Sequence, residues 1–158
     1  MNHPKTWNVL DWNVRGINSD KKWNSIRDKI VESRCEIVCL QETKESFDLQ
    51  FIKKFCPSDF DSFHFLPSIG ASGGILVVWK SSSFLGNPVF TNAYAISIEF
   101  TSKLSNDTWI LTTVYAPCTH TGKREFLEWF GGIQMPDDVH WLITGDFNLI
   151  RKPEDRNK

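Results

Sequence analysis

Segments with strand periodicity alternate with segments of helical periodicity along most of this 158-residue chain. Strand–helix–strand units normally join parallel strands, so residues that follow such strands gather at one edge of a sheet. That edge is where α/β proteins usually bind their ligands. The patterns predict strands at 6–13, 35–41, 62–66, 74–79, 89–91, 95–101, 109–115 and 140–144, helices at 22–34, 47–55 and 123–130, and turns at 70–74 and 86–88.

Composition places the chain among globular domains, because 41% of its residues are hydrophobic and its length suits one domain. The formal net charge of −1 does not indicate a nucleic-acid-binding surface. A local basic patch remains open, with residues 21–29 as one example, although a solvated face is the preferred explanation for any single basic cluster. The four cysteines form no paired Cys-x-x-Cys motifs, so neither a zinc site nor a disulfide framework is indicated.

The amino-terminal residues lack the charged start and apolar stretch of a signal peptide. The longest apolar run, residues 75–79, is too short to cross a bilayer. We therefore expect no membrane association and a nuclear or cytoplasmic location rather than secretion. Oligomeric state stays open.

Polar side chains with ligand or acid–base chemistry lie at the ends of four predicted strands: Asn13, Glu42, Tyr115 and Asp146. Oxygen ligands of this kind suit Mg²⁺, with Mn²⁺ as an alternative, better than zinc. Each residue also has a simpler explanation. Asn13 and the segment 145–148 could shape turns, Glu42 could be solvated, and Tyr115 could be a half-buried ring. Their shared position at one edge of the sheet favours a site.

Four short motifs carry a resemblance to a known family: 12–18 (WNVRGIN), 40–44 (LQETK), 114–117 (VYAP) and 145–148 (GDFN). In this order they resemble the endonuclease/exonuclease/phosphatase superfamily, which includes DNase I, exonuclease III and the apurinic/apyrimidinic endonucleases. The similarity is greatest to the endonuclease domain of plant LINE-type (non-LTR) retrotransposons, and it runs from about Trp7 to the end of the chain.

The resemblance implies a DNase I-like α/β fold: a four-layer sandwich of two mixed sheets with helices outside. It implies metal-dependent hydrolysis of phosphodiester bonds in DNA. Glu42 would ligate Mg²⁺, with Asn13 beside it contacting metal or phosphate. Tyr115 would hydrogen-bond the phosphate, Asp146 would orient and deprotonate the attacking water, and Asn148 would steady a phosphate oxygen.

One departure from the family pattern is clear. The family completes its site with a later Asp and a Ser-Asp-His motif, whereas His3, His64, His120 and His140 all precede Gly145 here. His120 is expected to lie in a loop. We therefore expect residues 6–158 to be the N-terminal part of such a domain, a truncated and incomplete sandwich, after a short tail at 1–5.

Two alternatives to a DNA endonuclease remain open at this point. One keeps the fold and metal chemistry but takes inositol phosphates or lipid head groups as substrate. The other is a non-catalytic, retrotransposon-derived fragment.

Overall fold

The structure is a computed structural model that describes residues 8–68, 73–117, 119–134 and 138–147. Every predicted strand and helix is found within this part of the chain, with differences mainly at the element ends. In chain order the elements are β1 (Val9–Asn13), α1 (Asp20–Ser33), β2 (Ile37–Gln41), α2 (Leu49–Ile52), β3 (Ser62–Leu66), β4 (Ile75–Trp79), β5 (Phe84–Thr91), β6 (Ala95–Ser102), β7 (Thr108–Tyr115), α3 (His120–Gly131) and β8 (His140–Asp146).

The strands form two four-stranded sheets, in the orders β1-β2-β4-β3 and β5-β6-β7-β8. Both sheets are mixed. β1 is parallel to β2 and β7 is parallel to β8, whereas all other neighbouring strands are antiparallel. A helix, α1 or α3, lies between the members of each parallel pair, as the strand–helix–strand pattern predicts.

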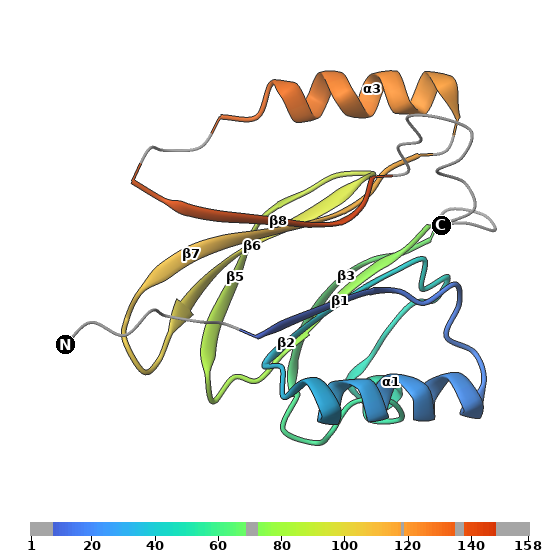
Figure 1. Cartoon of the computed structure of the whole chain (residues 1–158), viewed down its shortest axis with the longest axis vertical. Coiled ribbons are helices and arrows are strands. Elements are labelled where there is room, and N and C mark those ends of the chain that lie inside the picture. Colours follow the sequence, from blue (N-terminus) through green and yellow to red (C-terminus); the bar gives the residue numbers. More distant parts are fainter. Residues whose placement is uncertain (1–7, 69–72, 118, 135–137, 148–158) are drawn as a thin grey trace.

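The two sheets pack face to face with helices outside, which makes four layers (Figure 1). Helix α3 covers the sheet of β5 to β8, and α1 covers the sheet of β1 to β4. Three apolar clusters fill the three boundaries between layers, and the middle cluster combines side chains from both sheets, among them Ile37, Val77, Ile98 and Leu111. Because side chains alternate along a strand, each sheet can bury both of its faces. The mixed-sheet α/β class is confirmed.

Helix α1 begins where the turn residues of the sequence predict. The Ser19 hydroxyl accepts a hydrogen bond from the Lys22 N–H, which is a normal N-terminal cap. Ile26 and Ile30 lie one helical turn apart and are buried against the first sheet. This helix therefore covers the outer face of the first sheet.

Helix α2 is shorter than the predicted helix over 47–55. Asp48 caps its first turn through a hydrogen bond from the Phe51 N–H, so Phe47 lies outside the helix. Beyond its end the backbone forms i to i−3 bonds, for example from the Phe55 N–H to the Ile52 carbonyl. The four-residue spacing of the phenylalanines instead reflects an aromatic cluster, in which Phe47 contacts both Phe51 and Phe55 edge to face.

The turn predicted at 86–88 is wrong, because these residues lie inside β5. β5 is an edge strand that pairs only with β6 among the described strands. Proline is tolerated at a sheet edge, where its missing N–H is not needed for a ladder. The pairing register shifts between Pro88 and Phe90, which accommodates the proline.

The expectation of a loop at His120 is also wrong, since His120 is the first residue of α3 after the Thr119 cap. Among the residues that the structure describes, no helix has the length and apolar character that a membrane span requires. The predicted domain bounds, 6–158 with a tail at 1–5, stay a prediction.

Candidate active site

Four strand ends lie together at one end of the sandwich. β1 ends at Asn13, whose register partner is Gln41 at the end of β2. β7 ends at Tyr115, whose register partner is Asp146 at the end of β8. β1 also contacts β8, so the carboxyl ends of the two parallel pairs are neighbours although they belong to different sheets.

Asn13 and Asp146 are joined directly. The Asn13 side-chain N–H donates to Asp146 Oδ2 over 2.9 Å. The other end of the Asn13 amide, Oδ1, accepts a hydrogen bond from the Arg15 N–H over 3.1 Å. Asn13 thus shapes the turn after β1, as the simpler explanation requires, and also holds the Asp146 carboxylate.

Glu42 follows β2 and is fixed by its backbone. Its N–H donates to the Gly74 carbonyl over 2.9 Å, and its carbonyl accepts from the Gly16 N–H over 2.7 Å. The segment is therefore tied both to the turn after β1 and to the residue just before β4. The Glu42 carboxylate lies 3.6 Å from Lys44 Nζ, and 21% of the Glu42 side chain is exposed, so it stays accessible to a ligand.

Backbone strain gathers beside these residues. Arg15, Glu42 and Lys44 have φ angles of 53°, 58° and 60°, in the left-handed region that side chains other than glycine rarely adopt. Such conformations cost free energy and persist where the surrounding structure imposes them, often at functional sites. Gly74, with φ +95°, is needed there because an added Cβ would lie 2.5 Å from Thr43 Oγ1.

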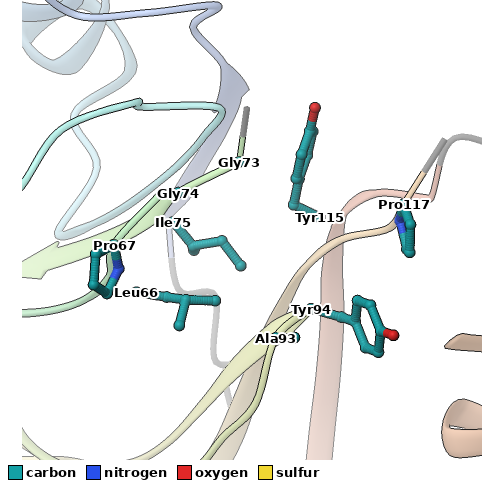
Figure 2. Close-up of a pocket in the computed structure, with 9 residues that line it drawn as sticks. All are labelled: Leu66, Pro67, Gly73, Gly74, Ile75, Ala93, Tyr94, Tyr115 and Pro117. Carbon is teal, nitrogen blue, oxygen red and sulfur yellow. The ribbon is translucent and has the colours of Figure 1, made fainter. Parts of the chain in front are cut away.

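Tyr115 borders a cavity of about 170 Å³ between the two sheets, shown in Figure 2. In this view Leu66 and Ile75 lie on one side of the cavity, and Tyr94 and Pro117 lie on the other. The Tyr94 hydroxyl donates to Glu125 of α3 over 3.1 Å, so it is engaged on the helix side. The described lining carries no charged side chain: Leu66, Pro67, Gly73, Gly74, Ile75, Ala93, Tyr94, Tyr115 and Pro117.

A second set of polar side chains lies between the sheets, next to the strand ends. The Gln41 side-chain N–H groups donate to Asp11 Oδ2 over 2.9 Å and to Thr113 Oγ1 over 3.2 Å. Burial raises the pKa of the Asp11 carboxyl; hydrogen bonds from Thr144 and Gln41 counteract this, and the negative charge of Asp146 adds to it. The two acids are therefore close enough to interact electrostatically.

Sequence reasoning did not find this second set. Gln41 and Asp11 both lie within predicted strands, at 35–41 and 6–13. A polar residue within an apolar strand is the signal that could identify them, since a buried polar group needs hydrogen-bond partners.

The residues at the strand ends fit a hydrated magnesium ion. Glu42 and Asp146 offer carboxylates and Asn13 offers an amide, all of them hard oxygen donors. Mg²⁺ commonly takes one or two carboxylates and keeps several waters or substrate phosphates. In the described parts of the chain no three His, Cys, Asp or Glu side chains group closely enough to hold a metal. An ion bound at this end would therefore depend on water and phosphate for its remaining ligands.

Asn148, the remaining residue predicted for the site, lies outside the described residues. His64 lies in the middle of β3 and His140 begins β8, and His64 Nε2 hydrogen-bonds with the Thr91 hydroxyl over 3.1 Å. Of the five predicted residues, the structure thus places Asn13, Glu42, Tyr115 and Asp146 at one end of the sandwich.

Comparisons with known proteins bear on the family and the fold. A family model described as the Endonuclease/Exonuclease/phosphatase family matches residues 12–156. This range contains all four motifs found in the sequence. A search of curated protein sequences gave no match.

Solved structures match the fold at low sequence identity. The human nocturnin catalytic domain with bound sulfate matches with a TM-score of 0.62 and 15% identity, over 89% of this chain and 64% of that one. A mannosyl-6-phosphatase from Bacteroides thetaiotaomicron gives 0.62 and 13%, over 91% and 66%. TDP2 from D. rerio, complexed with single strand DNA product, gives 0.60 and 20%, over 94% and 63%. These matches confirm the DNase I-like fold, and the chain spans just under two thirds of each of these structures.

Proposed function

This chain belongs to the Endonuclease/Exonuclease/phosphatase family, and we propose that it hydrolyses phosphodiester bonds of DNA with Mg²⁺ or Mn²⁺. The observation that carries the proposal is the hydrogen bond between Asn13 and Asp146. It joins the first and last motifs, 133 residues apart, at the strand ends where Tyr115 also lies. An acid held in this way is oriented before a substrate arrives.

Glu42 and Asn13 are the proposed metal ligands. Glu42 suits this role because its backbone is fixed on both sides while its side chain stays partly exposed. When bound, the metal would offset the negative charge that grows on the phosphate oxygens during attack. Lys44 currently balances the Glu42 carboxylate and would release it to the ion.

Asp146 is the proposed general base. It would accept a proton from a water molecule while the water oxygen forms a bond to phosphorus. The phosphorus–oxygen ester bond opposite would break, and the departing oxygen would take a proton from solvent, leaving a phosphate monoester and a hydroxyl. Tyr115 would donate a hydrogen bond to the phosphate, and Asn148 would steady another of its oxygens. A base of this kind contributes roughly 10²–10⁴-fold to the rate.

The chemistry of the cavity beside Tyr115 favours DNA over inositol phosphates. A pocket for a polyphosphate needs several cationic side chains, because each phosphate carries negative charge. The described lining of this cavity has none and is mainly apolar. Such a surface suits the uncharged sugar or base that flanks a scissile phosphate. A similar fold, D. rerio TDP2, was solved with single strand DNA product, which adds support.

We further propose that the chain is of the LINE-type retrotransposon kind. The sequences of segments 145–158 (GDFNLIRKPEDRNK) and 73–75 (GGI) support this subgroup. The genomic reading frame around the coding sequence tests it. A reverse transcriptase encoded downstream in the same frame would support the assignment, and an unrelated single-exon gene would contradict it.

Nicking of supercoiled plasmid by the purified, folded protein tests the hydrolase proposal. We expect relaxed circles in Mg²⁺ or Mn²⁺ and none in EDTA. Glu42→Gln and Asp146→Asn should each abolish nicking, whereas Asp28→Asn, an exposed acid on α1, should cut like the wild type.

Two other outcomes separate the alternatives. Hydrolysis of soluble inositol phosphates without DNA nicking would favour the phosphatase. A cooperatively folded protein that cleaves neither substrate would contradict the hydrolase proposal and favour the non-catalytic fragment.

A further inference from the structure

Gln41 links the two sheets beneath the candidate active site. It belongs to β2 in the first sheet, and its side chain is almost fully buried, with 1% exposed. One side-chain contact goes to Asp11 of β1 in its own sheet, and another goes to Thr113 of β7 in the opposite sheet. An amide nitrogen carries two N–H groups, so these two contacts use its full donor capacity.

Apolar side chains occupy the same inter-sheet space along the rest of these strands. Cys39 precedes Gln41 on the same face of β2, and Leu111 precedes Thr113 on the same face of β7, and both are in the middle apolar cluster. A buried amide costs free energy unless it is fully hydrogen-bonded, and a well-packed apolar residue avoids that cost. The hydrogen bonds of Gln41 are therefore poor evidence for added stability. They instead indicate that the two sheets need a defined lateral alignment.

The residues that bond to Gln41 lie two positions before the site residues on their strands. Asp11 and Asn13 share a face of β1, and Thr113 and Tyr115 share a face of β7, because side chains two residues apart point the same way. Thr113 is the register partner of Thr144 on β8, and Asp146 follows Thr144 on the same face. A shift of one sheet against the other would break the contacts of Gln41 and separate Asn13 from Asp146 together.

We propose that Gln41 and Asp11 are positioning residues, which hold the two sheets in the one alignment that lets Asn13 meet Asp146. The role in catalysis rests on the proposed function, whereas the alignment itself does not. Hydrogen bonds are directional and short-ranged, so they fix a lateral position that apolar packing alone leaves adjustable. Misplacement of reacting groups by about 1 Å can lower a rate by about 10²-fold.

Two neighbouring threonines provide a matched test. Thr112 and Thr113 are both fully buried, and both hydroxyls are hydrogen-bonded. Thr113 accepts from Gln41 between the sheets. Thr112 faces α3 instead, where it bonds to Ser97 and accepts from the Trp141 indole. Thr113→Val and Thr112→Val therefore remove comparable contacts on opposite faces of β7.

The measurements are kcat, KM and the side-chain amide NMR signal of Asn13. We expect Thr113→Val and Gln41→Leu to lower kcat about tenfold or more with little change in KM. Both should move the Asn13 amide signal toward that of a solvent-exposed amide. Thr112→Val should leave the Asn13 signal and kcat unchanged even if it lowers the melting temperature equally. Asp11→Asn keeps an acceptor for Gln41 and should retain most of the wild-type behaviour, whereas Asp11→Leu should not.

Three results decide the matter. An unchanged Asn13 signal and kcat in folded Thr113→Val and Gln41→Leu would overturn the proposal. Equal losses in Thr112→Val would also overturn it, because the effect would then be one of general stability. If the wild type is inactive but the Asn13 signal still responds to Thr113→Val alone, the alignment role is supported and the hydrolase proposal fails.

Discussion

Asn13 and Asp146 belong to different sheets, yet a hydrogen bond of 2.9 Å from Nδ2 to Oδ2 joins them. Asn13 ends a strand that is parallel to β2, and Asp146 ends a strand that is parallel to β7. The contact thus ties the carboxyl ends of two parallel pairs, one from each half of the sandwich. It makes the position of the proposed base dependent on how the two sheets pack.

Glu42 and Lys44 should have opposite effects on cation binding. Glu42→Gln removes the proposed carboxylate ligand and should weaken Mn²⁺ binding by about tenfold or more. Lys44→Gln removes a positive charge 3.6 Å from that carboxylate and should tighten binding by about fivefold, since a partly exposed pair of this kind is worth about 1 kcal/mol. Calorimetric titration measures both. Glu32→Gln, an exposed acid on α1, serves as the control. Equal affinity in all variants would remove Glu42 from the metal site.

Gly145 should tolerate no side chain. Its φ of +127° is unfavourable for other residues, and an added Cβ would overlap the Val114 carbonyl oxygen of β7. Gly145→Ala should therefore force β8 away from β7 next to Asp146, with a loss of about 1–3 kcal/mol or more in unfolding free energy. Gly131, at the end of α3, has open space around it, so Gly131→Ala should change stability by less than about 1 kcal/mol. Urea unfolding of both variants would show the difference, and equal midpoints would contradict the close approach of β7 and β8.

Phe100 should be essential for packing between the sheets. It is fully buried and contacts the rings of Trp79, Phe84 and Trp109. Phe100→Ala should lower the free energy of unfolding by about 3–5 kcal/mol, because it leaves a cavity in the middle layer. Phe90, which is 43% exposed, gives a matched control whose Ala variant should lose much less. Chemical denaturation measures both, and the face-to-face packing is contradicted by a Phe100 variant as stable as the Phe90 variant.

Asp61 should stabilise the fold at neutral pH and lose this contribution in acid. Its carboxylate accepts hydrogen bonds from the Ser81 hydroxyl over 2.7 Å and from the Ser81 N–H over 2.9 Å. These bonds lower its pKa from the ordinary 3.8, chiefly through the hydroxyl. A lowered pKa means that the stabilisation is present above pH 3.8 and is lost as pH falls through the folded-state pKa.

Thermal unfolding across pH tests the Asp61 contact. The melting temperature of Asp61→Asn should lie slightly below that of the wild type at pH 7, because the group is exposed and solvent screens it. The gap should close as the solution is acidified below pH 3.8. Ser81→Ala should reproduce the effect and add little in the double variant. A gap that stays constant across pH would show that the Asp61 charge plays no part.

Local patterns predicted most of the elements, because the strand and helix periods depend on residues close in the chain. They also predicted which residues end the strands, since a parallel pair joined by a helix must align its carboxyl ends. The turn predicted at 86–88 is wrong because Gly, Asn and Pro are typical turn residues, whereas here they lie inside β5. Only the edge position of β5 makes a strand acceptable there.

The sequence by itself thus determined the order of strands and helices, the family motifs and the presence of Asn13, Glu42, Tyr115 and Asp146 at strand ends. Tertiary structure alone decided that Asn13 reaches Asp146 and that Gln41 bridges β1 and β7. The physical reason is the distance along the chain over which each interaction acts. Periodicity and turn preference are set by neighbouring residues, whereas the lateral alignment of two sheets depends on side-chain packing between residues far apart in the chain.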